Sequence, residues 1–172
     1  MLAKIAEQLK IHPDKRARKL GFFLKYGSLK FDLNTRRHWN EKLSRYPVFW
    51  RDENYHHILD LLPREEAFSL LDVGCAVGDG CELLQREFPK ARIEGADFSE
   101  VGVRAAIRKT RKVRYRILDI VKSEISKTYD YITLIETLEH FRVPFRIIDK
   151  CLRRVRKALI ISVPYSPGKS GR

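Results

Sequence analysis

The sequence predicts an α/β protein in which a doubly wound, mostly parallel sheet follows an N-terminal helical extension. Three observations lead to this prediction. From residue 68 onward, short apolar runs alternate with amphipathic segments. A glycine-rich turn directly follows the first of these runs, and polar side chains recur where the later runs end. We therefore expect a helical extension over residues 1–66 and an α/β domain over residues 67–172.

Composition limits the class of protein. At 172 residues and 44% hydrophobic content, the chain is long enough for one domain with a substantial core. No apolar run approaches the roughly 20 residues that a membrane span needs, and we expect no secretory signal. The three cysteines are odd in number and lack CxxC spacing, which favours buried, reduced thiols in a cytoplasmic protein.

The first third of the chain reads as a series of helices. Apolar residues at helical spacing predict helices over residues 2–10, 14–26, 35–45 and about 55–62, the last ended by Pro63. Trp39 and Tyr55 belong to a group of aromatic residues that would line a pocket or, as single aromatics more often do, belong to the core.

The remainder alternates between strands and helices. Strands are predicted over residues 68–73, 91–96, 113–118, 129–135 and 158–163. Helices are expected over residues 78–88, from an N-cap at Ser99 to residue 109, and over 144–156. The last of these helices is expected to bury its apolar side chains at i, i+3, i+7 and i+10, which are Phe145, Ile148, Leu152 and Val155.

The stretch LLDVGCAVGDG, residues 70–80, is the centre of the predicted site. A buried strand there runs into a turn too tight for large side chains and then into a helix. Glycines in such a turn let a ligand approach the backbone, and the free N–H groups of the new helix suit a polar ligand. Asp72 precedes the turn, where its carboxylate is expected to reach a cation or an amine.

This stretch resembles motif I of the class I methyltransferases that use S-adenosylmethionine (SAM). The residues that match the motif are Asp72, Gly74, Ala76, Gly78 and Gly80, with Ala76 in place of a glycine. The resemblance implies a Rossmann-like fold with SAM as cofactor, bound in part by these residues. It also implies a seven-stranded sheet, of which this sequence supplies five strands and lacks the last two. In that family, N-terminal segments often cover the cofactor or shape the substrate pocket, whereas the plainer expectation is that they only pack on the sheet.

Two further acidic residues end predicted strands. Asp97 ends the second, and the resemblance implies that its carboxylate holds the ribose hydroxyls of SAM; the alternative is that Asp97 and Ser99 only cap the next helix. Asp119 ends the third, where the family often binds the adenine amino group. The resemblance implies that Ile120 packs on the adenine ring and that Phe98 stacks on its other face. A simple turn at Asp119 is the alternative.

The fourth strand runs into Glu136, Glu139 and His140, in the pattern ExxEH. This pattern resembles small-molecule, quinone-type and sugar methyltransferases, and also RNA-terminal 2′-O-methyltransferases. His140 is a candidate general base because imidazole titrates near neutrality. Alternatively, the three residues would bind a divalent ion, or they would form only a capped turn. Glu136 is also a candidate cofactor ligand. In the relatives that use a metal, a further histidine usually comes from beyond the fifth strand. No histidine follows His140 in this sequence, so a complete four-ligand metal site is not expected.

Together these features predict a SAM-dependent methyltransferase that acts on oxygen. A small hydroxylated molecule, a glycan or a lipid-linked precursor is the expected acceptor. The net charge of +13 gives a basic surface that suits nucleic acid, an anionic membrane or a phosphorylated substrate. RNA 2′-O-methylation is therefore the first alternative, and a degenerate domain that binds SAM without turnover is the second. The oligomeric state is not predicted.

Overall fold

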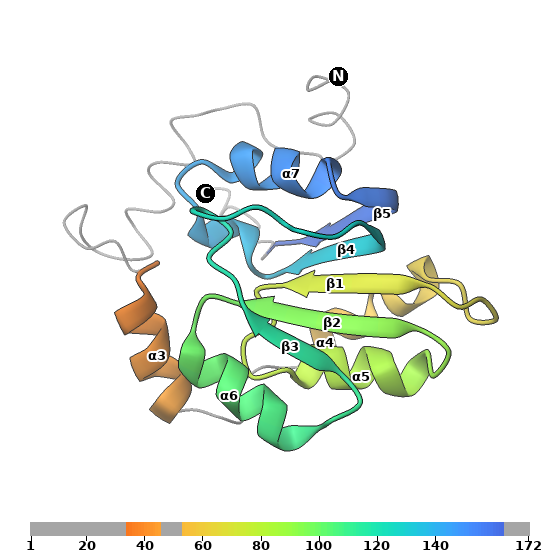
Figure 1. Cartoon of the computed structure of the whole chain (residues 1–172), viewed down its shortest axis with the longest axis horizontal. Helices are drawn as coiled ribbons and strands as arrows, with labels where there is room; N and C mark the ends of the chain where they lie inside the picture. The colour runs from red at the N-terminus through yellow and green to blue at the C-terminus, as the bar shows by residue number, and fades with distance from the viewer. Residues whose placement is uncertain (1–33, 46–52, 164–172) are drawn as a thin grey trace, which may run out of the picture. The chain divides into compact units, whose positions relative to one another are not determined.

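The computed structural model describes residues 34–45 and 53–163, which lie within one compact unit (Figure 1). Its centre is a five-stranded sheet in the order β3-β2-β1-β4-β5, in which every neighbouring pair is parallel. The strands are β1 (Ser69–Val73), β2 (Arg92–Asp97), β3 (Arg114–Ile117), β4 (Tyr129–Ile135) and β5 (Val155–Ser162). The chain runs outward from β1 to β3 and then returns to β4 beside β1. This reversal is the doubly wound arrangement that the sequence predicted, and ligands bind at such a switch point.

Helices cover both faces of the sheet. Figure 1 shows α5 (Asp79–Glu87) and α6 (Glu100–Lys109) on one side and α7 (Pro144–Leu152) on the other. Before the sheet, the chain forms α3 (Arg36–Arg45), α4 (Glu53–His56) and the 3₁₀ helix η1 (Leu59–Leu61). A second 3₁₀ helix, η2 (Leu138–His140), follows β4. The α3 helix packs on α6 and α4 packs on α5, so this part of the predicted extension lies on the sheet's helices.

The core forms where strand faces meet helix α5. All five residues of β1 are buried, and its Leu70 is in register with Ile93 of β2 and Tyr131 of β4. These three side chains share one cluster with Leu84 and Phe88 at the inner face of α5. The alternation of buried strand and amphipathic helix in the sequence therefore corresponds to the observed layers.

The prediction of a single helix near residues 55–62 is wrong. This segment is split into α4 and η1, because the turns from Tyr55 to Ile58 and from Leu59 to Leu62 close through i→i+3 hydrogen bonds of 3.1 and 3.3 Å. These tighter turns still bury Ile58, Leu59 and Leu62. A spacing of three residues suits a 3₁₀ helix as well as an α-helix.

The buried face expected for the helix at residues 144–156 is also wrong. Helix α7 ends at Leu152, and the chain enters β5 at Val155, three residues earlier than predicted. Phe145 and Leu152 are 38% and 39% exposed, whereas Ile147, Ile148 and Cys151 are buried. The expected i, i+10 pattern extended across a helix–strand boundary, so it joined side chains that belong to different elements.

Two further expectations concern the cysteines and membrane-spanning helices. Cys75, Cys81 and Cys151 are free and buried, as predicted. Among the described residues, no helix combines the length and the apolar character that crossing a membrane requires.

Candidate functional site

The turn after β1 is fixed to the neighbouring strand by its backbone. The N–H groups of Gly74 and Cys75 both donate to the carbonyl oxygen of Ala96, at 2.7 and 3.2 Å. Gly74 and Gly78 have φ of +86°, which favours glycine. A Cβ at Gly74 would collide with the side chain of Thr137, and one at Gly80 with the ring of Tyr55. The glycines therefore make room for protein side chains, and their contact with a cofactor stays a prediction.

Two residues other than glycine adopt left-handed backbone conformations in the described part of the chain. Ala76 and Glu136 both have φ of +48°. Ala76 follows β1 and Glu136 follows β4, so both lie at the carboxyl ends of adjacent central strands. Such conformations cost of order 1 kcal/mol each, and they concentrate at functional sites. Their position at the switch point marks this edge of the sheet as the candidate site.

Asp72 lies in the interior rather than at an open edge. Its side chain is fully buried, and its two oxygens accept from the hydroxyl of Thr133 at 2.7 Å and that of Tyr55 at 2.8 Å. The thiol of Cys81 lies 3.4 Å from the second oxygen. Burial raises the pKa of Asp72, and these hydrogen bonds oppose that rise. Asp72 thus joins α4 to β1 and β4, and the structure shows it reaching no cation or amine among the described residues.

Asp97 ends β2 with its carboxylate directed at backbone N–H groups. One oxygen accepts from Ala76 at 3.0 Å and the other from Ser99 at 2.8 Å. Ser99 also caps α6 by accepting from the N–H of Gly102, as predicted. Each carboxylate oxygen has two lone pairs, so each retains acceptor capacity after these bonds. The carboxylate fixes the turn after β1, and its role toward a ribose diol stays a prediction.

The environment of Asp97 predicts a pH-dependent site. Burial raises the pKa of Asp97 to about 6, against the opposing effect of the two backbone hydrogen bonds. If the ionised form accepts from a diol, protonation must compete with binding. We expect SAM affinity to fall about tenfold for each unit of pH below 6 and to be level above pH 7, as measured by calorimetry. A flat profile between pH 5 and 7.5 would contradict this role.

The stability of the ligand-free protein should depend on pH in the opposite sense. Because the pKa of Asp97 is higher in the folded state than in the unfolded state, the folded protein binds more protons between about pH 4 and 6. The contribution of Asp97 to stability is therefore present in full below pH 4 and is lost as the pH rises through 6.

The residues expected around adenine have defined protein contacts. Asp119 accepts from the N–H of Val121 at 3.2 Å and lies 3.6 Å from the ammonium group of Lys122. These contacts form a simple turn at Asp119, which was the expected alternative to adenine binding. Phe98 packs against the cluster of Trp39 and Ala76, and Ile120 is buried. The roles of Asp119, Phe98 and Ile120 toward adenine stay predictions.

The ExxEH residues separate into two groups. Glu136 turns toward β5, where it accepts from the hydroxyl of Ser162 at 2.8 Å. Glu139 and His140 lie on η2, with Nε2 of His140 at 3.8 Å from a carboxylate oxygen of Glu139. Among the described residues, no three His, Cys, Asp or Glu side chains gather as metal ligands would. Residues 137–141 form a 3₁₀ turn closed by i→i+3 hydrogen bonds, so the general-base role of His140 and the simple capped turn both stay predictions.

Helix α3 connects the two sides of this edge. Its Asn40 accepts from the hydroxyl of Ser99 at 2.6 Å, next to the end of β2. Its Trp39 packs on Ala76 and contacts the ring of His140 edge-to-face at 4.9 Å, next to the end of β4. Figure 1 shows α3 at the end of the sheet to which the strand arrows point. The helix therefore braces the strand ends where the candidate residues lie.

Sequence reasoning assigned no role to Asn40, Thr133 and Ser162, although each contacts a candidate residue. Thr133 and Ser162 are polar residues in otherwise apolar strand segments, which is a signal for a specific hydrogen bond. Their partners depend on strand register, such as the pairing of Asp72 with Thr133. That register cannot be deduced from a single sequence. Asn40 lies in a polar helix, where nothing distinguishes it.

Comparison with known proteins gives the same family as the motifs. A methyltransferase domain profile matches residues 38–169. The chain is 33% identical over 82 residues to trans-aconitate 2-methyltransferase of Variovorax paradoxus, a match that covers 48% of this chain and 32% of that protein. It is 28% identical over 95 residues to malonyl-[acyl-carrier protein] O-methyltransferase of Priestia megaterium, which covers 54% and 35%. The matched region thus spans about a third of these relatives.

A solved structure shares the fold. The plantazolicin methyltransferase BpumL, in complex with a desmethyl analogue and S-adenosylhomocysteine (SAH), superposes with a TM-score of 0.54 at 22% identity. The superposition covers 91% of this chain and 55% of BpumL. Because the domain profile matches more than half of the chain and the sheet has the predicted topology, the chain belongs to the class I, SAM-dependent methyltransferase family.

Proposed function

We propose that this protein transfers a methyl group from SAM to an oxygen atom of a small hydroxylated molecule, a glycan or a lipid-linked precursor. The observation that carries the proposal is the position of three candidate residues at one edge of the sheet: Asp97 ends β2, Glu136 directly follows β4, and His140 lies on η2 just beyond it. Support for oxygen as the acceptor atom comes from the relative that acts as an O-methyltransferase on malonyl-[acyl-carrier protein].

The residues that would hold the cofactor belong to this edge. The carboxylate of Asp97 would accept from the ribose hydroxyls, and the turn at residues 74–78 is already fixed beside it. Backbone strain at Ala76 and Glu136 supports the same location. SAM supplies an activated methyl group when bound. The protein's task is therefore to align the acceptor and to exclude water.

In this proposal, His140 would take the proton of a hydroxyl acceptor. Its ring is held between Trp39, at 4.9 Å, and Glu139, whose carboxylate lies 3.8 Å from Nε2. A carboxylate favours the protonated imidazole, so Glu139 would stabilise His140 after it removes the proton. Glu139 is a positioning residue in this scheme, and His140 is the general base.

The experiment that tests the proposal has two stages. Calorimetry with SAM and SAH tests the cofactor site, and absence of binding at millimolar ligand would reject it. Transfer of labelled methyl from SAM into an extract of the source cell, followed by fractionation, would then identify the acceptor. Label that is stable to mild base excludes a methyl ester and is the result required of a methyl ether on a hydroxyl acceptor. Label lost as methanol indicates a carboxylate ester and would contradict the hydroxyl.

Replacement of His140 by glutamine tests the general base. Glutamine preserves a polar side chain but cannot take the proton, so we expect kcat to fall about 100-fold or more with little change in SAM affinity. The measurement is steady-state methyl transfer, with SAM binding measured separately. A matched control is His56→Gln, because His56 lies on α4, outside the proposed catalytic residues. An unchanged rate for His140→Gln would remove His140 from the mechanism.

A further inference from the structure

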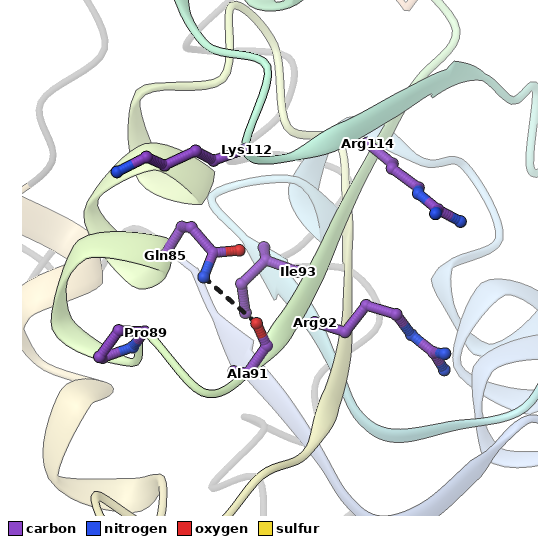
Figure 2. Close-up of a pocket in the computed structure, with 7 residues that line it drawn as sticks. All are labelled: Gln85, Pro89, Ala91, Arg92, Ile93, Lys112 and Arg114. Atoms are coloured by element: carbon purple, nitrogen blue, oxygen red, sulfur yellow. Dashed lines mark hydrogen bonds between the residues drawn. The ribbon is translucent and has the colours of Figure 1, made fainter.

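A basic groove lies at the amino ends of β2 and β3, away from the carboxyl ends that carry the candidate site. It has a volume of about 530 Å³. The end of α5 contributes Gln85, and the strand segments contribute Arg92, Ile93 and Arg114. Lys112 completes its cationic rim (Figure 2). The groove therefore combines the apolar side chain of Ile93 with three cationic side chains.

The positive charges on the rim are uncompensated. Arg92, Lys112 and Arg114 are exposed, and none forms an ion pair or a side-chain hydrogen bond with another described residue. Glu94 is in register with Arg114, but its carboxylate is already bound by Lys127 at 3.1 Å and by the hydroxyl of Tyr129 at 2.8 Å. Glu94 is thus shared by Lys127, Tyr129 and the charge of the nearby Arg116, so one acid faces several cations and the groove favours an anionic ligand.

A fourth cation, Arg116, adds to the excess of positive charge near the groove. Arg116 lies two residues after Arg114 on β3 and therefore projects from the same face of the strand. Its Nη1 donates to the hydroxyl of Ser126 at 3.2 Å, whereas Nε and Nη2 are buried without an acceptor among the described residues. A buried guanidinium with unsatisfied donors is costly. Negative charge bound nearby would reduce that cost.

The directions of the side chains indicate the shape of the ligand. In Figure 2, Lys112 extends from one side of the groove, whereas Arg92 and Arg114 extend together toward the opposite side. Arg108 and Arg111, which are also exposed and unpaired among the described residues, continue the basic segment before Lys112. Cations that extend in two directions suit a ligand with several phosphates, whereas a flat membrane surface suits cations that point in one direction. A flexible chain with repeated phosphates can follow the groove between them.

We propose that this groove binds the sugar-phosphate backbone of a single-stranded nucleic acid. The lining residues include no aromatic side chain on which bases could stack, so the contact is with phosphates and is independent of sequence. The groove lies at the opposite ends of β2 and β3 from Asp97 and the turn after β3. Binding there does not require the nucleic acid to be the methyl acceptor, and it stands or falls separately from the proposed methyl transfer.

Fluorescence anisotropy of a labelled oligouridine of about 12 nucleotides tests the proposal on the full chain at about 50 mM salt. We expect the double variant Arg92→Ala/Arg114→Ala to bind about tenfold or more weakly. The slope of log K against log salt should become shallower by about 1.4, as for two lost phosphate contacts. The control Arg37→Ala/Arg153→Ala removes the same charge from exposed positions on α3 and just after α7, and we expect it to change affinity less than about twofold.

Three results would overturn the proposal. The first is absence of binding to oligouridine at about 100 μM protein. The second is an equal loss of affinity in both double variants. The third is that Arg92→Ala/Arg114→Ala no longer binds phosphatidylserine vesicles but still binds oligouridine as the wild type does. The second would show that net charge alone attracts the strand, and the third would assign the groove to a membrane. Thermal melting and SAH calorimetry on each variant establish that the fold and the cofactor site are intact.

Discussion

Replacing Asp97 with alanine is expected to weaken SAM binding by about 10- to 100-fold, because hydrogen bonds to a charged group contribute about 1.5–3 kcal/mol. The variant loses the acceptor proposed for the ribose. It also releases the backbone N–H groups of Ala76 and Ser99, which the carboxylate now holds at 3.0 and 2.8 Å. Both effects act on the proposed cofactor site, so the loss should appear in the dissociation constant measured by calorimetry.

Asp97→Asn is the matched comparison for this result. The amide oxygen can still accept one of the two backbone hydrogen bonds, but the residue has no charge and cannot titrate. We expect weak binding that no longer changes between pH 5 and 7.5, in contrast to the wild-type protein. If Asp97→Ala binds SAM as tightly as the wild type does, then Asp97 has only the helix-capping role that the sequence also allowed.

Trp39→Ala is expected to lower the free energy of unfolding by about 3 kcal/mol, since truncation of a buried tryptophan removes a large packed surface. Trp39 is 8% exposed and shares a core cluster with Leu43, Ala76 and Val77. Its indole N–H also donates to Asn34 at 3.2 Å. Because this cluster joins α3 to the turn after β1, the same variant should weaken SAM binding. Urea denaturation measures the first effect and calorimetry the second.

Trp39→Phe separates packing from the indole hydrogen bond. Phenylalanine retains an aromatic ring beside His140 but lacks the N–H that Asn34 accepts. We expect it to recover more than half of the lost stability. Hydrogen exchange in α3 should increase in the alanine variant and stay near the wild-type rate in the phenylalanine variant. Equal stability of all three proteins would show that α3 contributes little to the folded domain.

The strands were predictable because the pattern is local. β4 has the predicted bounds, β1 begins one residue later than predicted, and β2 and β3 each differ by one residue at both ends, whereas β5 begins three residues earlier. The N-cap at Ser99 was also predictable, since its hydroxyl bonds to a backbone group three residues ahead. In each case the information lies within a few residues of the element itself. The doubly wound order then follows from the rules that govern parallel strands joined by helices.

The features that could not be predicted depend on contacts between residues that are far apart in the sequence. The sequence places Asp72 at the end of a strand, but not beside the hydroxyls of Tyr55 and Thr133 that bind it. Helix α7 carries apolar residues on more than one face, and only packing against the sheet decides that Ile148 is buried and Phe145 is exposed. The separation of Glu136 from His140 likewise depends on the left-handed backbone at Glu136, which periodicity cannot reveal.

The backbone at position 76 restricts which residues natural variants of this protein can carry there. With φ at +48°, a β-branched residue is excluded by its own backbone. Asparagine tolerates that conformation, but its longer side chain would have to displace the indole of Trp39. Glycine adopts this conformation without strain, whereas alanine accepts some strain and packs its methyl group in the cluster that holds Trp39. Ala76→Gly is therefore expected to relieve backbone strain and to leave a small void beside the indole.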